Sequence, residues 1–275
     1  MTCQLSVGEP VIDPSSRDRY SPSPTSAISG RALPLTRDFY DRPVLEVAPE
    51  LLGCVVRHGP VAVRVTEVEA YAGERDPGSH AFRGRTARNA VMFGPPGHLY
   101  CYFTYGMHTC CNLVCGPKGE ASAVLLRGGE VVDGEPVARA RRERSRPMAR
   151  RDLARGPARL VQALGLDLSA DGLDVTDPRG DLTLSAADPA VATGEARTGP
   201  RVGVRGPGGD GTAYPWRFWL ADEATVSTYR PAAPSPRGGA RAGIGQAPAL
   251  VRGTGRHRAG WAPAATDRSG RNHRP

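Results

Sequence analysis

Residues 54–71 read CVVRHGPVAVRVTEVEAY. The stretch predicts a β-hairpin, because two valine-rich runs flank a short His-Gly-Pro turn. If the second run, residues 61–71, stays a regular strand, alternate side chains share one face, and Glu69 lies on the same face as Val61, Val63 and Val65. A carboxylate on such an apolar strand needs partners, which makes Glu69 a candidate functional residue.

The segments around this hairpin predict an α+β fold. Helices are predicted over 44–52, 131–145 and 157–164, and further strands over 99–105, 108–115, 121–127, 202–204 and 216–220. Hairpins outnumber strand-helix-strand units in this order. The pattern therefore favours a curved antiparallel or mixed sheet with packed helices over a doubly wound fold.

The two ends of the chain differ in composition from its middle. Residues 1–35 are rich in Ser, Pro and Asp, and residues 231–275 are rich in Gly, Ala, Pro and Arg. Such composition is typical of disordered segments, so we expect one folded domain over residues 36–230. The formal net charge is +8, and the last segment holds eight arginines against Asp267, a balance of +7.

A second basic cluster lies inside the expected domain. Residues 139–159 contain nine arginines against Glu143 and Asp152, again a balance of +7. Clustered arginine suits phosphate recognition, as do the free backbone N–H groups of a helix opened by Gly156-Pro157, although a solvated helix face has the same composition.

Cysteine and hydrophobicity patterns exclude several classes of protein. The six cysteines form no C-x-x-C pair, which predicts small buried thiols and no zinc ribbon. No apolar run approaches the ~20 residues of a membrane helix, and no signal peptide is recognisable. We expect a cytoplasmic protein with no membrane partner.

Aromatic residues gather after the hairpin, in a chain with 6% aromatic content: His80, Tyr100, Tyr102 and Tyr105. Each ring alone is compatible with an ordinary core or loop position, and Glu69 alone with a fraying strand end. Together they suit an enzyme that extrudes a base, encloses it between rings and fills the gap in the duplex.

The ordered set of motifs closely resembles the alkyladenine (3-methyladenine) DNA glycosylases. The set comprises Glu69-Ala70-Tyr71, His80, residues 97–107 (GHLYCYFTYGM), Asn112, residues 124–127 (VLLR), Gly156-Pro157 and residues 201–204 (RVGV). The resemblance covers about residues 40–230. It implies a single mixed α+β domain with a curved, mostly antiparallel, open-barrel-like sheet. It also implies a monomer that uses no metal or other cofactor.

The resemblance implies a role for each base-contacting position. Tyr71, His80 and Tyr102 match the rings that enclose the flipped base. Asn112 matches an amide that disfavours normal guanine through its exocyclic amine. Tyr105 matches the residue that is inserted into the duplex.

The catalytic positions are implied in the same way. Glu69 matches the general base, and Arg127 matches the residue that helps to position the water and the nucleotide backbone. Lys118, the only lysine of the chain, lies in a Lys-Gly loop away from Glu69 in sequence, so we expect water as the nucleophile and no Schiff-base lyase step.

The predicted function is therefore a monofunctional DNA glycosylase of base excision repair, associated with the nucleoid in a bacterium. It would act on damaged double-stranded DNA, releasing 3-methyladenine, 7-methylguanine, hypoxanthine or ethenoadenine and leaving an abasic site. Two alternatives remain open. Glu67 and Glu69, ~7 Å apart along a strand, could form the carboxylate pair of a nucleoside or sugar glycosidase, or the rings and arginines could belong to a non-catalytic nucleic-acid binder.

Overall fold

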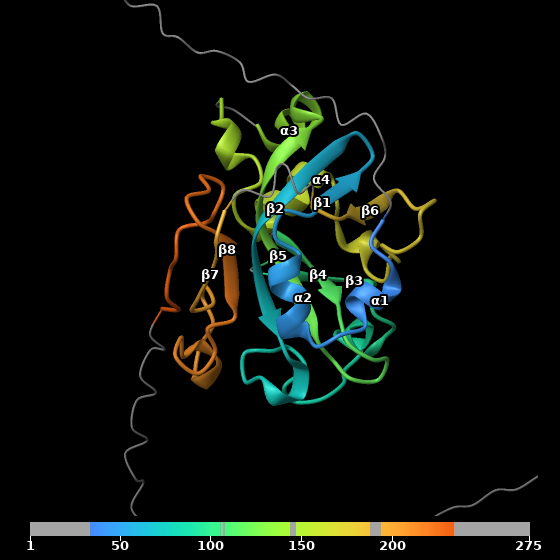
Figure 1. Ribbon diagram of the computed structural model, residues 1–275, viewed down its shortest axis with the longest axis vertical. Helices are drawn as coiled ribbons and strands as arrows, with labels where there is room; N and C mark the ends of the chain where they lie inside the picture. Colours follow the sequence, from blue (N-terminus) through green and yellow to red (C-terminus); the bar gives the residue numbers. More distant parts are fainter. Residues whose placement is uncertain (1–33, 105, 107, 144–146, 188–193, 234–275) are drawn as a thin grey trace, which may run out of the picture. The chain divides into compact units, whose positions relative to one another are not determined.

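The computed structural model describes residues 34–104, 106, 108–143, 147–187 and 194–233 (Figure 1). The predictions of disorder for residues 1–35 and 231–275 fall almost wholly outside these ranges, and so does the prediction for Tyr105. Among the described helices, none is long and apolar enough to cross a membrane.

The core of the fold is an eight-stranded sheet. Its strands are β1 (Val55–His58), β2 (Val61–Tyr71), β3 (Leu99–Thr104), β4 (His108–Val114), β5 (Ala123–Asp133), β6 (Leu182–Ser185), β7 (Ala196–Gly199) and β8 (Arg217–Leu220). The order along one path is β3-β4-β5-β2-β1-β6, while β8 pairs with β2 and β7, and all of these pairs are antiparallel. Within the described ranges no pairing joins β3 to β6, so the sheet is open, and the predicted fold class is confirmed.

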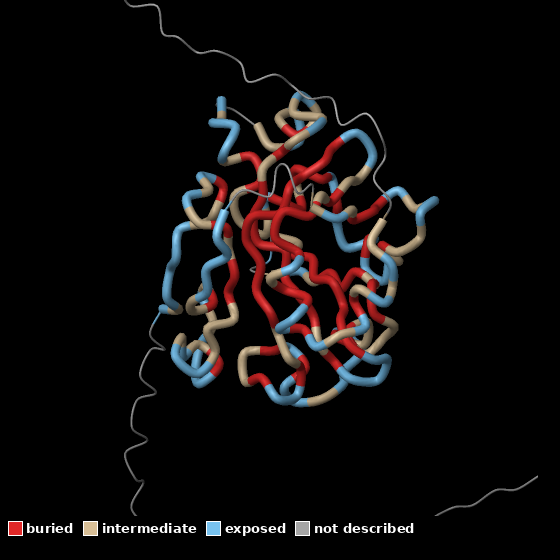
Figure 2. Tube along the Cα trace, viewed as in Figure 1, coloured by how far each residue is buried: buried red, intermediate tan, exposed pale blue. Residues whose placement is uncertain are grey.

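Helices pack on this sheet and enclose one main hydrophobic core. They are α1 (Arg37–Tyr40), α2 (Val44–Glu50), α3 (Glu135–Arg142) and α4 (Pro157–Leu164), with short 3₁₀ turns η1 (Gly73–Arg75), η2 (Ala90–Phe93), η3 (Arg150–Asp152), η4 (Leu168–Ala170) and η5 (Pro207–Gly209). Both α2 and α4 contact β2 and β5, and α3 packs against α4. Figure 2 shows the buried positions concentrated along the central strands.

The faces of β2 differ from the prediction because the strand contains a β-bulge. Val65 pairs with Gly129 but Glu67 pairs with Gly128, so Thr66 is an extra residue. A Cβ on Gly129 would lie 2.4 Å from the Arg64 carbonyl oxygen, and the close approach of the strands here requires glycine.

The bulge changes which side chains face the core. Before it Val63 and Val65 point into the main core, and after it Val68 and Ala70 do. The prediction that Glu69 shares a face with the valines at 61, 63 and 65 is therefore wrong. Glu69 lies on the opposite face.

Two other predictions need correction. Strand β5 extends to Asp133, so residues 131–133 are not helical, and α3 begins only after Gly134, whose φ of +69° a residue with a Cβ adopts poorly. Residues 202–204 form no strand. Strands β6 and β7 are not predicted, and β7 is exposed over most of its length, so it has no alternating apolar pattern.

The expectation of buried thiols is confirmed for the five described cysteines, none of which forms a disulfide.

Candidate active site

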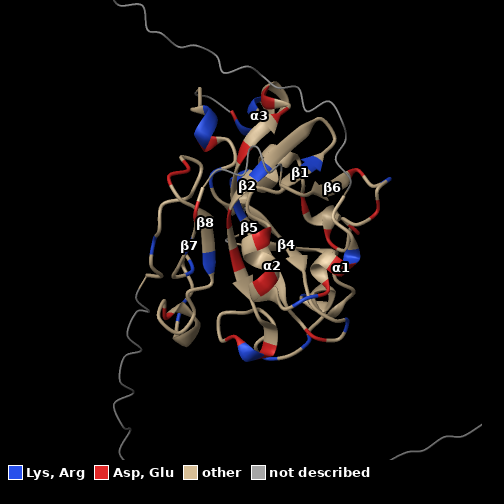
Figure 3. Cartoon of the chain, viewed as in Figure 1, with Lys and Arg blue, Asp and Glu red and all other residues tan. Residues whose placement is uncertain are grey.

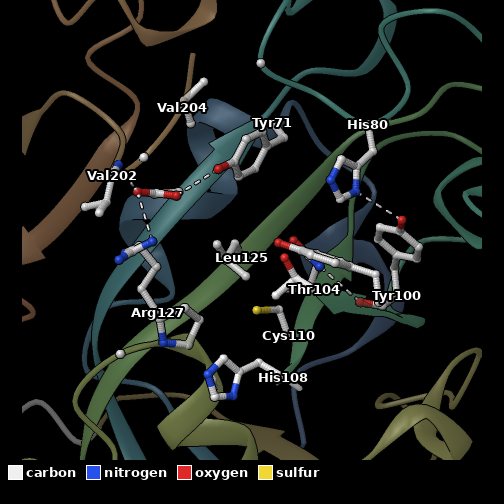
Figure 4. A pocket seen from close by; sticks show the side chains of 18 of the residues that line it. Tyr71, His80, Tyr100, Thr104, His108, Cys110, Leu125, Arg127, Val202 and Val204 are labelled. Atoms are coloured by element: carbon white, nitrogen blue, oxygen red, sulfur yellow. Dashed lines mark hydrogen bonds and ion pairs between the residues drawn. The ribbon is translucent and has the colours of Figure 1, made fainter. Parts of the chain in front are cut away.

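A pocket with a volume of ≈ 810 Å³ lies where β2, β3, β4 and β5 meet the first turn of α4 and residues 202–205 (Figure 4). Its wall brings together six of the predicted site residues: Glu69, Tyr71, His80, Tyr102, Asn112 and Arg127. Figure 4 shows Tyr71, Arg127 and Val202 on one side and His80 with Tyr100 on the other.

Glu69 is a fully buried carboxylate with its orientation set by two hydrogen-bond donors and one ion pair. One oxygen, Oε2, accepts a hydrogen bond of 2.8 Å from the Tyr71 hydroxyl. The other, Oε1, accepts one of 2.7 Å from the Val202 N–H and lies 3.4 Å from Nη1 of Arg127. Burial, and then the charge of Glu69, raise the pKa of Tyr71 well above its ordinary value, so its phenol stays protonated and donates. In the segment 202–204, which the sequence predicts as a strand, the Val202 N–H therefore donates to the site carboxylate and not to a neighbouring strand.

Glu67 has a different environment, although it is only two residues away. It is fully buried, lies outside the pocket wall, and accepts from Nε of Arg127 at 2.9 Å and Nε of Arg217 at 2.7 Å. The Ser227 N–H and hydroxyl donate to it at 2.7 and 2.8 Å. Burial raises the pKa of Glu67, but the two arginines and the hydrogen bonds from Ser227 together outweigh this effect and leave the pKa below its ordinary value. This placement removes Glu67 as half of a carboxylate pair around a substrate.

The rings of the pocket come from β3 and from the loop after η1. Tyr100 and Tyr102 alternate along β3, and their centroids are 5.7 Å apart. The His80 ring lies 4.5 Å from that of Tyr102, and its Nδ1 is 3.2 Å from the Tyr100 hydroxyl. Burial, and then the charge of Arg88, lower the pKa of His80, which favours a neutral ring. Burial raises the pKa of Tyr100 to about 12. The pocket therefore presents uncharged rings.

Asn112 lies on β4 opposite Tyr100 and Leu125. Its side chain is buried, and its Nδ2 donates a hydrogen bond of 3.1 Å to the Tyr100 carbonyl oxygen. The strand pairing thus orients the amide at the pocket wall.

A buried ion pair behind Tyr71 was missed by sequence reasoning. Arg201 and Asp76 are both inaccessible to solvent at their side chains and bind in a bidentate manner, with N–O distances of 2.6 and 2.7 Å. Arg201 also donates to the carbonyl oxygens of Ala70 and Gly208, and its Cζ lies 4.6 Å from the Tyr71 ring centroid. The pair joins the end of β2, the loop that leads to His80, and residues 201–208. Asp76 is an unremarkable loop residue in sequence, and Arg201 stood out only within the RVGV motif.

The arginine cluster at 139–159 is only partly directed at the pocket. Arg142, Arg155 and Arg159 line it beside Gly156 and Pro157. Both these three and other members have partners within the chain, which are Glu135 and Glu143 for Arg139, the Ala163 carbonyl for Arg141, the Leu153 carbonyl and Gln162 for Arg142, the Val131 carbonyl for Arg150, and Asp152 for Arg155 and Arg159. Figure 3 accordingly shows acidic and basic residues interspersed around α3.

The pocket combines a buried carboxylate with a set of uncharged rings and is lined by strands of an open antiparallel sheet. An enzyme that acts on an extruded base needs a site of this kind. A sequence model of the family described as Methylpurine-DNA glycosylase (MPG) matches residues 38–224. A protein of Streptomyces avermitilis is 57% identical over 209 residues, which cover 74% of this chain and 95% of the relative. One of Leifsonia xyli subsp. xyli is 58% identical over 201 residues, covering 70% and 92%. Both carry the name "Putative 3-methyladenine DNA glycosylase".

The chain belongs to the methylpurine-DNA glycosylase family. Membership confirms the resemblance identified in the sequence and the predicted enzyme class, a DNA glycosylase that hydrolyses N-glycosyl bonds.

Proposed function

We propose that this chain is a monofunctional glycosylase that removes alkylated or deaminated purines from duplex DNA in base excision repair, with Glu69 activating the attacking water. The supporting observation is the placement of the Glu69 carboxylate, which two hydrogen bonds and an ion pair hold in one orientation at the wall of a pocket that also contains His80 and Tyr102. The substrates we propose are 3-methyladenine, 7-methylguanine, hypoxanthine and ethenoadenine.

The reaction requires both a general base, which takes a proton from water, and a negative charge near the sugar. The N-glycosidic bond breaks through an oxocarbenium-like sugar, so a nearby carboxylate stabilises the developing positive charge and also takes a proton from water. Each carboxylate oxygen has two lone pairs, and the hydrogen bond from Tyr71 uses only one of those on Oε2 of Glu69, which leaves room there for a water. Arg127 and the Val202 N–H keep the carboxylate oriented during this step.

The pocket also supports the proposed recognition of the base. Tyr71, His80 and Tyr102 would stack on the extruded base, and the amide of Asn112 would oppose the exocyclic amine of normal guanine. Arg155, Arg159 and the N-terminus of α4 would face the phosphates. We propose a monomer that acts on damaged duplex DNA in the cytoplasm, at the nucleoid.

The function is tested with duplexes that carry one hypoxanthine, ethenoadenine or 7-methylguanine, incubated with purified protein and then treated with alkali. We expect strand breaks at the lesion only after alkali, because in the described part of the chain the pocket wall contains no lysine to form a Schiff base, and Lys118 is exposed. Undamaged duplex stays intact. If none of the lesions gives strand breaks after alkali, the proposal is refuted. A covalent complex with DNA that is trapped by borohydride would refute its monofunctional part. Hydrolysis of free nucleosides without duplex DNA would favour the nucleoside glycosidase instead.

The neutral state of His80 predicts a pH effect that depends on the lesion. A cationic base such as 7-methylguanine stacks on a neutral imidazole, whereas protonation of His80 places a second positive charge beside it. As the pH falls through the lowered pKa of His80, which lies below the ordinary value of about 6.5, the single-turnover rate should therefore fall more for 7-methylguanine than for neutral hypoxanthine. His80→Asn should remove the difference between the two lesions. A rate ratio that does not change with pH in the wild type would contradict this expectation.

A further inference from the structure

Four charged side chains form a buried cluster at the bulge of β2. They are Glu67 and Glu69 on β2, Arg127 on β5 and Arg217 on β8, with exposed fractions of 0%, 0%, 7% and 4%. Their formal charges cancel, with two carboxylates against two guanidinium groups. Buried charges of this kind are stable only when each is paired and hydrogen-bonded.

Glu67 is the hub of this cluster. It accepts Nε of Arg127, while Nη1 of the same guanidinium lies 3.4 Å from Glu69, so one planar group bridges the two carboxylates. The same oxygen of Glu67, Oε1, also accepts Nε of Arg217, and Nη2 of Arg217 donates to the Ser227 carbonyl oxygen. The angle at which Arg127 meets Glu69 therefore depends on a residue outside the pocket wall.

The same sheet holds a second cluster that serves as a comparison. Arg64, also on β2, pairs with Glu130 at 2.9 Å and with Glu223 at 2.6 Å. Through Glu223 this cluster connects the sheet to residues 223–227, as Glu67 does through Ser227. None of the members of this second cluster lines the pocket. If Glu67 only connected these segments, its substitution would have the same effect as substitution of Glu223.

We propose that Glu67 is a positioning residue for base release, which holds the Arg127 guanidinium against Glu69 and balances its charge. The inference rests on the proposed role of Glu69 as general base. Without Glu67 the cluster carries a net positive charge, which opposes the developing cation of the sugar and makes the Glu69 carboxylate a weaker base. Without Arg217 the excess charge has the opposite sign.

The other groups that act on Glu69 keep the same charge throughout the experiment that follows. These groups are Tyr71 on β2, Tyr102 on β3, Cys110 on β4, Arg127 on β5 and Arg201. Burial raises the pKa of both tyrosines and of the cysteine, so they stay uncharged at acidic pH. Hypoxanthine, which is neutral over this range, minimises the contribution of His80.

The test compares the pH dependence of single-turnover hypoxanthine release in Glu67→Gln, Arg217→Gln and the double variant. The midpoint of the acidic limb should move to lower pH by about one unit in Glu67→Gln, to higher pH in Arg217→Gln, and back toward the wild-type position in the double variant. The rate on the plateau of Glu67→Gln should fall about 10- to 100-fold with unchanged affinity for the DNA. A midpoint does not depend on a loss of active protein that is constant with pH, and circular dichroism at each pH checks that every variant stays folded over the acidic limb.

Glu223→Gln is the matched control, since it loses an ion pair on the same sheet but should keep the wild-type midpoint and plateau. Identical midpoints in all variants, or shifts of the same sign in both single variants, would overturn the proposal. Full activity in Glu69→Gln would instead refute the proposed function itself, whatever the behaviour of Glu67→Gln.

Discussion

Asp76→Asn should lower the free energy of unfolding by about 3–5 kcal/mol, because it leaves the fully buried guanidinium of Arg201 without its counter-charge. The substitution keeps the size of the side chain, so no cavity contributes. The measurement is denaturant unfolding of the wild type and the variant at neutral pH. Since Arg201 also packs on Tyr71, base release should decline together with stability.

The matched control for this prediction is Glu195→Gln. It makes the same change from acid to amide, but in an ion pair with Arg197 whose side chains are 77% and 58% exposed, at an N–O distance of 3.4 Å. Exposed pairs contribute little, so its unfolding curve should superimpose on that of the wild type. Equal stability of the two variants would show that the Asp76 pair is not the structural tie that its burial indicates.

Glu69→Gln should lower the single-turnover rate of base release by about 10³-fold, within the range typical of a lost general base. The amide retains the shape of the carboxylate but neither deprotonates water nor stabilises the cationic sugar. Tyr71→Phe, which removes only the 2.8 Å hydrogen bond to Oε2, should cost a much smaller factor. A larger loss in Tyr71→Phe than in Glu69→Gln would be incompatible with the assigned roles.

Local sequence patterns predicted most of the elements that carry the site. The valine-rich run at 61–71 is β2, and the segment that begins at Gly156-Pro157 contains α4 (Pro157–Leu164). These predictions succeed because the periodicity of apolar residues and the Gly-Pro signal are local properties. The alternation of Tyr100 and Tyr102 along β3 likewise places both rings at one pocket.

Features that depend on distant partners could not be predicted. The bulge that turns Glu69 away from the valine face requires Gly129 on the neighbouring strand, and nothing in residues 61–71 indicates it. Asp76 and Arg201 are 125 residues apart, so neither residue signals the other. The partners of Glu67 are also distant in sequence. The sequence alone therefore leaves Glu67 open as half of a carboxylate pair, whereas in the structure it binds Arg127, Arg217 and Ser227.

The central claim is that Glu69 acts in the chemical step rather than in folding or in binding DNA. One measurement separates these roles, namely the single-turnover rate and the equilibrium affinity of the wild type and Glu69→Gln on the same hypoxanthine duplex. We predict that the rate falls by about 10³-fold while the affinity stays within a few-fold of the wild-type value. An unchanged rate, or a loss of rate that is fully explained by a loss of DNA binding, would contradict the claim.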